Sequence, residues 1–114
     1  MSRFWWSFSP TCNTTRVVLI MKMVRFFLGL DVGKSEIVAT LMDDEEKELF
    51  RGSFKNQLSG FREMMKAVTG VTLNLAKEYQ IYAGMEATGT YYLKLVKFLY
   101  KKVDGVTPYV INPN

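Results

Sequence analysis

The chain has 114 residues, 48% hydrophobic and 23% charged, which is the balance of one folded domain or part of one. With one cysteine, Cys12, and no histidine, it cannot contain a disulfide framework, a Ser-His-Asp triad, a Cys-His pair or a zinc site that uses imidazole. The net charge is +4, and because residues 43–48 hold five of the eleven acids, the remainder has a basic excess that suits a polyanion or simply solubilises helix faces.

Residues 1–22 differ from the rest, since they contain both tryptophans and the cysteine. The apolar run Val17–Met21 is too short for a signal peptide or for a membrane-spanning helix, which needs about 20 apolar residues. We therefore expect a cytoplasmic protein without a membrane partner. We interpret residues 1–22 as a leader, either disordered or a mis-assigned start, and residues 23–114 as the domain. The natural first residue is then Met1, Met21 or Met23.

Three strands are predicted first. Val24–Val32 is an apolar run bounded by a glycine, Ile37–Met42 is the second candidate, and Leu49–Phe54 returns as the third, with Gly52 as a bulge. The acidic run Asp43–Glu46 predicts a solvated turn between the second and third strands.

A helix follows, with Ser59 as its expected N-cap. We expect a break at Gly70 and helix again over Val71–Tyr79. Its buried face has the helical spacing i, i+3, i+4, i+7 and carries Phe61, Met64, Met65 and Val68.

The last part of the chain alternates strand, helix and strand. Ile81–Met85 is a short apolar strand, Thr88 or Thr90 caps the next helix, and Pro108–Ile111 is the fifth strand. The buried face of the second helix is predicted to carry Tyr92, Leu95, Val96 and Leu99. The order β-β-β-α-β-α-β predicts an α/β fold with a mixed sheet, in which an antiparallel meander is followed by parallel strands.

Two acids stand at strand ends. Asp31 closes the first apolar strand, where an unpaired buried carboxylate would be unfavourable, and Glu86 directly follows the fourth strand. If these strands are parallel neighbours, both acids meet at the edge where α/β proteins bind ligands. Two carboxylates suit Mg²⁺ or Mn²⁺, which can activate water without histidine. The alternative is that each acid only caps the turn or helix after it.

Four lysines are candidates for contact with nucleic acid. Lys94, Lys97 and Lys101 share the polar side of the second helix, and Lys34 lies in the turn after the first strand. The segment around Lys34 is not a phosphate-binding loop, because only three residues separate its glycines and a strand follows it. A solvated turn lysine is the simpler interpretation of Lys34.

Four blocks occur in order along the chain: Gly29-Leu30-Asp31-Val32-Gly33-Lys34-Ser35, Gly60-Phe61, Met85-Glu86-Ala87-Thr88-Gly89-Thr90-Tyr91 and Val110-Ile111-Asn112-Pro113. From about Met23 to Asn114 the chain resembles the N-terminal domain of the DEDD-type, RuvC-like insertion-sequence transposases, a group that includes the Piv-type invertases. The resemblance implies a ribonuclease-H-like fold and Mg²⁺-dependent cleavage and transfer of DNA strands at transposon ends and target. It assigns the first two catalytic, metal-binding acids to Asp31 and Glu86.

The chain departs from this family in one respect. The third and fourth acids of the family follow the Asn-Pro motif, and the sequence ends at Asn114 before such a block, while Asp104 falls in a loop. We therefore expect a fold that is incomplete at its C-terminus, a fragment that does not cleave DNA alone, and an exposed apolar sheet face. Family members also act with a guide RNA, so the resemblance adds RNA as a candidate partner. A homo-oligomer is a separate candidate, which no feature of the sequence specifies.

Two other classes stay open. One is a fragment of an actin-like or sugar-kinase ATPase, whose opening turn also has an Asp-x-Gly pattern, although Lys34 stands where those proteins have Thr or Ser. The other is a non-enzymatic module in which the basic helix binds nucleic acid.

Overall fold

The computed structural model describes residues 23–87, 89–103 and 105–112. The leader expected at residues 1–22, and also Thr88 and Asp104, lie outside the described residues. The elements follow the predicted order, and they are β1 (Val24–Val32), β2 (Glu36–Met42), β3 (Glu48–Lys55), α2 (Leu58–Leu75), β4 (Tyr79–Glu86), α3 (Leu93–Lys102) and β5 (Val106–Ile111).

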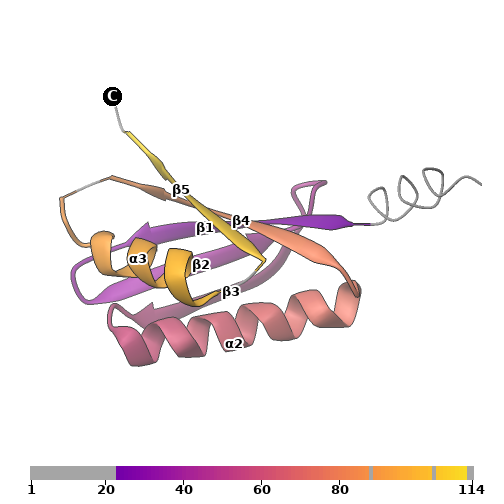
Figure 1. The fold of residues 1–114 in the computed structure, drawn as a ribbon, viewed down its shortest axis with the longest axis horizontal. Helices are drawn as coiled ribbons and strands as arrows, with labels where there is room; N and C mark the ends of the chain where they lie inside the picture. Colours follow the sequence, from indigo (N-terminus) through magenta and orange to yellow (C-terminus); the bar gives the residue numbers. More distant parts are fainter. Residues whose placement is uncertain (1–22, 88, 104, 113–114) are drawn as a thin grey trace, which may run out of the picture.

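The five strands form one mixed sheet in the order β3-β2-β1-β4-β5 (Figure 1). β1 pairs antiparallel with β2, and β2 with β3, whereas β1 pairs parallel with β4, and β4 with β5. The predicted meander and the predicted parallel strands are therefore both confirmed. Each parallel pair is joined through a helix, as a crossover connection requires.

One face of the sheet forms the hydrophobic core with both helices. Side chains alternate between the two faces of a strand, so the buried residues of β1, β2 and β4 share one face. α2 and α3 pack on this face, with α2 near β3 and α3 near β5 (Figure 1). The buried residues of these three strands are Phe26, Leu28, Leu30, Ile37, Ala39, Leu41, Ile81, Ala83 and Met85. We call the opposite face of the sheet the open face.

The prediction for the first helix was wrong in three details. α2 continues through Gly70, because Val68 and Thr72 on either side are fully buried against the sheet. Their burial outweighs the cost of one glycine in a helix, which is about 1 kcal/mol. The helix ends at Leu75, and Tyr79 is instead the first residue of β4. The N-cap position is Gln57, not Ser59, and it makes no capping bond through its side chain.

Two other local predictions were also wrong. Gly52 pairs regularly with Ala39, and the register shift lies at the end of β2, between Leu41 and Met42. The N-cap position of α3 is Tyr92 rather than Thr90, and it also lacks a capping side-chain bond. In both helices the apolar face packed on the sheet fixes the start, so propensity at the cap does not decide it.

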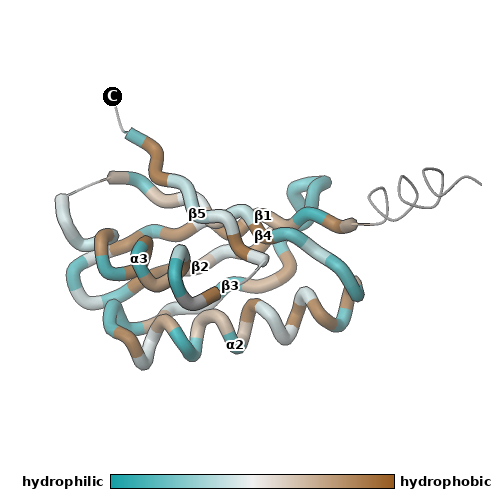
Figure 2. The backbone as a smooth tube through the Cα atoms, viewed as in Figure 1, coloured by the Kyte–Doolittle hydropathy of each residue, from teal (hydrophilic) through white to brown (hydrophobic). Residues whose placement is uncertain are grey.

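The turn between β2 and β3 has its own hydrogen bonds and is hydrophilic (Figure 2). The Asp43 carboxylate accepts bonds from the backbone N–H groups of Glu45 and Lys47, each at 2.9 Å. Glu46 has a φ of 65°, the left-handed conformation that closes the turn. The predicted solvated turn is confirmed. Among the described residues, no helix is long and apolar enough to cross a membrane.

Candidate functional site

Asp31 and Glu86 lie next to each other on the open face. Leu30 of β1 is in register with Met85 of the parallel strand β4, so the following residues, Asp31 and Glu86, are also neighbours. Leu30 and Met85 are buried on the helix side, and both acids are exposed on the other side. Neighbouring strands are about 4.8 Å apart, so Asp31 and Glu86 occupy adjacent positions on one face at the carboxyl ends of β1 and β4.

The exposure of Asp31 corrects part of the sequence argument. The expectation treated Asp31 as a buried strand carboxylate, but the alternation of β1 places it on the uncovered face. The cost of a buried charge therefore gives no argument for Asp31, which is a candidate only through its position beside Glu86. The turn after Asp31 is closed by a backbone hydrogen bond, from the Gly33 N–H to the Glu36 carbonyl at 2.8 Å. For Asp31, this contact gives no support to a purely capping role.

The two carboxylates are a donor set that suits a hard divalent cation. Mg²⁺ is commonly held by one or two protein carboxylates and completes its shell with water or phosphate oxygens. Among the described residues, no group of three or more His, Cys, Asp or Glu side chains is arranged so that it could hold a metal ion. Asp31 and Glu86 therefore fit a metal ion that takes its other ligands from elsewhere.

Part of the open face is apolar. The rings of Phe27 and Tyr82 stack with centroids 5.7 Å apart. Tyr109 of β5 lies across Gly84, where a Cβ would come within 2.8 Å of its ring. Ile111, in register with Glu86, is 48% exposed. No helix of the described chain covers this surface.

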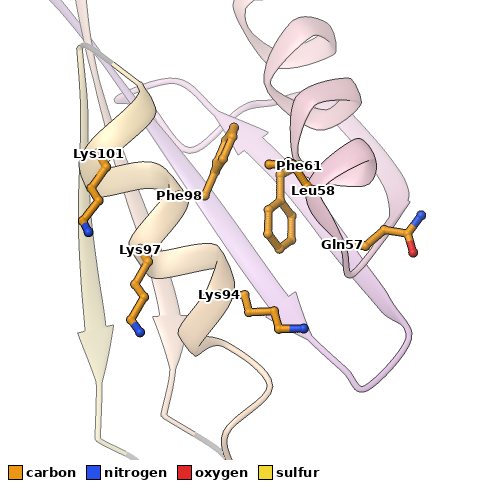
Figure 3. Close-up of a pocket in the computed structure, with 7 residues that line it drawn as sticks. All are labelled: Gln57, Leu58, Phe61, Lys94, Lys97, Phe98 and Lys101. Atoms are coloured by element: carbon orange, nitrogen blue, oxygen red, sulfur yellow. The ribbon is translucent and has the colours of Figure 1, made fainter.

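The three helical lysines form a different site, on the opposite side of the sheet. Lys94, Lys97 and Lys101 extend from α3 at one side of a groove between α2 and α3 (Figure 3). The groove has a volume of about 410 Å³, and its apolar lining is Leu58, Phe61 and Phe98. The structure does not bring these lysines together with the carboxylates. Lys34 is exposed in the β1–β2 turn, three residues after Asp31.

Sequence reasoning missed Asn56, which connects the loops on both sides of the site. Its amide nitrogen donates to the Gly33 carbonyl at 2.8 Å and to the Tyr91 carbonyl at 3.1 Å. An asparagine between a strand and a helix is an ordinary turn residue, so no sequence signal distinguished it. Only the folded structure shows that Asn56 lies between the loops that follow the two candidate acids.

Comparison with known proteins gives one family. The family model DEDD_Tnp_IS110, described as a transposase, matches residues 28–114. That match contains Asp31, Glu86 and all four of the candidate lysines. A comparison with curated proteins finds no match.

Solved structures add a likeness of fold. The chain is similar to Pelota of Archaeoglobus fulgidus, with a TM-score of 0.51 and 14% identity over 87% of this chain and 29% of that one. It is also similar to a foamy viral protease-reverse transcriptase, with a TM-score of 0.49 and 12% identity over 93% of this chain and 30% of that one. The chain is also similar to a Ppx/GppA protein of Aquifex aeolicus, with a TM-score of 0.42 and 11% identity over 79% of this chain and 36% of that one. The chain thus spans 29% to 36% of these proteins, and the likeness to Pelota shows the fold alone.

Proposed function

This chain belongs to the DEDD-type transposase family whose model matches residues 28–114, and from that membership we propose that it supplies Asp31 and Glu86 to a metal site for cleavage and transfer of DNA strands. The mixed α/β sheet is compatible with the ribonuclease-H-like fold of this family. The observation that carries the proposal is the position of Asp31 and Glu86, which are neighbours on one face at the carboxyl ends of parallel strands.

In this proposal the two acids have one task. Their carboxylates would hold Mg²⁺ or Mn²⁺ on the open face, at the carboxyl ends of β1 and β4. No helix of the described chain covers this position, so a DNA phosphate could reach the ion there. When bound, the ion supplies a Lewis acid for the phosphoryl group and activates a water or hydroxyl nucleophile. The exposed position of both acids supports this role, because the site is accessible to a large polyanionic substrate.

We further propose that the described chain does not cleave DNA alone. Family members use four acids, and the described residues bring together only two. The remaining acids would have to approach over the open face, beside Tyr109 and Ile111. Burial of these exposed apolar side chains would favour such an approach. A guide RNA stays a proposal from the family resemblance, and a homo-oligomer a separate proposal.

The lysines support contact with nucleic acid. Lys94, Lys97 and Lys101 offer a row of exposed cations on α3, and Lys34 lies at the carboxylate end. A binding module without catalysis is the second candidate, because this row stands apart from Asp31 and Glu86. The alternative of an actin-like or sugar-kinase ATPase has no support from the family match.

A calorimetric titration of the full chain with Mn²⁺ tests the proposal. We expect one saturable site, which is lost in both Asp31→Asn and Glu86→Gln because each variant removes half of the anionic ligand set. Asp44→Asn is the matched control, since it removes the same charge from the exposed turn between β2 and β3. Equal binding by all four proteins, or loss only in the control, would contradict the metal site.

A further inference from the structure

The strongest unassigned feature is the Asn56 side chain, which joins two loops far apart in the sequence. Gly33, whose carbonyl accepts one bond, comes two residues after Asp31. Tyr91, whose carbonyl accepts the other, comes five residues after Glu86. A single amide group therefore holds the segments that leave both candidate ligands.

The chemistry of these contacts requires an amide. A side-chain NH₂ group has two hydrogens, and here both point to backbone carbonyls, so the nitrogen and oxygen positions follow from the partners. A carboxylate of the same shape has no hydrogen to donate, and a hydroxyl has only one. The backbone adds a third bond, from Asn56 N–H to the Ser35 carbonyl at 2.9 Å. Asn56 is thus fixed to the β1–β2 turn from two directions.

The oxygen atom of the Asn56 amide differs from the nitrogen in its contacts. Asn56 Oδ1 is buried and has no hydrogen-bond partner among the described residues. Burying an unpaired acceptor lowers stability, a cost that the bonds donated by the same amide have to offset. The two donated bonds are what a smaller or apolar residue could not supply.

Resting on the proposed function, we infer that Asn56 is a positioning residue for the metal site. By holding the Gly33 and Tyr91 carbonyls, it fixes the loops after β1 and β4 and so keeps Asp31 and Glu86 at a spacing that one ion can bridge. It touches neither carboxylate. Groups that orient metal ligands from outside the first coordination sphere commonly change affinity by 10- to 100-fold, and we place Asn56 at the lower end, at about tenfold.

The test is a Mn²⁺ titration of the full chain and of Asn56→Asp and Asn56→Ala, at a temperature where circular dichroism shows each protein folded. Gln57→Ala is the control, because the adjacent amide bonds only to Ser59 Oγ within α2. We expect the dissociation constant to rise about tenfold in both Asn56 variants and to stay unchanged in the control. Hydrogen exchange at the Gly33 and Leu93 amides, which close the two loops, should accelerate only in the Asn56 variants.

The outcomes distinguish failure of the proposed metal site from failure of the positioning role of Asn56. Absence of binding by the unaltered chain overturns the proposed function, and the positioning role with it. Binding of normal affinity in both Asn56 variants, with normal exchange at Gly33 and Leu93, overturns the positioning role alone. Loss of the folded state in both variants would assign Asn56 to overall stability and also overturn the positioning role.

Discussion

Gly60 lies in the first turn of α2, where the helix starts directly against the end of β3. A Cβ at this position would lie 1.9 Å from the Lys55 carbonyl oxygen, a distance that no side chain can occupy. Gly70, in the same helix, is exposed and has no atom within 4 Å of the corresponding position. The two glycines therefore have different reasons to be glycine, although the sequence presents them alike.

Alanine at the two positions should change stability in opposite directions. We expect Gly60→Ala to lower the free energy of unfolding by about 1–3 kcal/mol or more, because α2 must move away from β3. Gly70→Ala should raise it by about 0.5–1 kcal/mol, since alanine restricts the unfolded chain and favours helix. Urea denaturation followed by circular dichroism measures both. A stabilising Gly60→Ala would contradict the close packing at the start of α2.

At the scale of elements, α3 presents two different surfaces. Leu95 and Leu99 are fully buried against the sheet, while Lys94, Lys97 and Lys101 are exposed along the groove beside α2 (Figure 3). Lysines at this spacing can each contact a phosphate of one strand or groove, and each contact releases counterions. The three lysines can therefore be replaced without changing the side of α3 that is buried against the sheet.

Replacement of Lys94, Lys97 and Lys101 by glutamine should weaken binding to any nucleic acid of sufficient length. The slope of log affinity against log salt should fall by up to about 3, roughly one for each phosphate contact. The control replaces Lys47, Lys66 and Lys77 by glutamine, which changes the net charge equally but outside the groove. Fluorescence anisotropy at several salt concentrations measures both slopes. Equal slopes for the two variants would mean that net charge, and not the α3 surface, attracts nucleic acid.

The elements could be predicted from the sequence where hydrophobic pattern decides them. The bounds of β1 were predicted without error, and the turn at Asp43–Glu46 was confirmed. A bounded apolar run favours a buried strand, and a run of acids favours an exposed turn, so each pattern indicates one kind of structure. The ends of α2 and α3 were not, since contact with the sheet outweighed the caps expected at Ser59 and Thr90. Local signals are weak where tertiary packing fixes the boundary.

For the candidate site, the sequence predicted the residues but not their surroundings. Asp31 and Glu86 could be chosen because they lie at the ends of apolar strands, whereas the adjacency of β1 and β4 was only a condition of that argument, which the register of the sheet fulfils. Which face they occupy depends on the exact register of the pleat, and Asn56 acts through backbone carbonyls of two distant loops. Neither feature leaves a pattern in a single sequence.

At the scale of the whole molecule, the sheet separates two surfaces of different chemistry. The helix side carries the groove with its three lysines, and the open face carries the two acids among exposed apolar residues. A polyanion held at one surface does not compete with a cation held at the other. In our proposal the DNA strand to be cleaved and any further acids meet the metal on the open face, while the lysines contact nucleic acid on the helix side.

The most direct measurement of the central claim is paramagnetic broadening of backbone amide signals by substoichiometric Mn²⁺ in the full chain. Bound Mn²⁺ broadens nearby amides, so the pattern locates the ion independently of any substitution. The account predicts that amides of residues 31–34 and 86–87 broaden first, in the same titration step. Broadening confined to the acidic turn at residues 43–48, with both strand ends unchanged, would show that Asp31 and Glu86 do not share a metal ion.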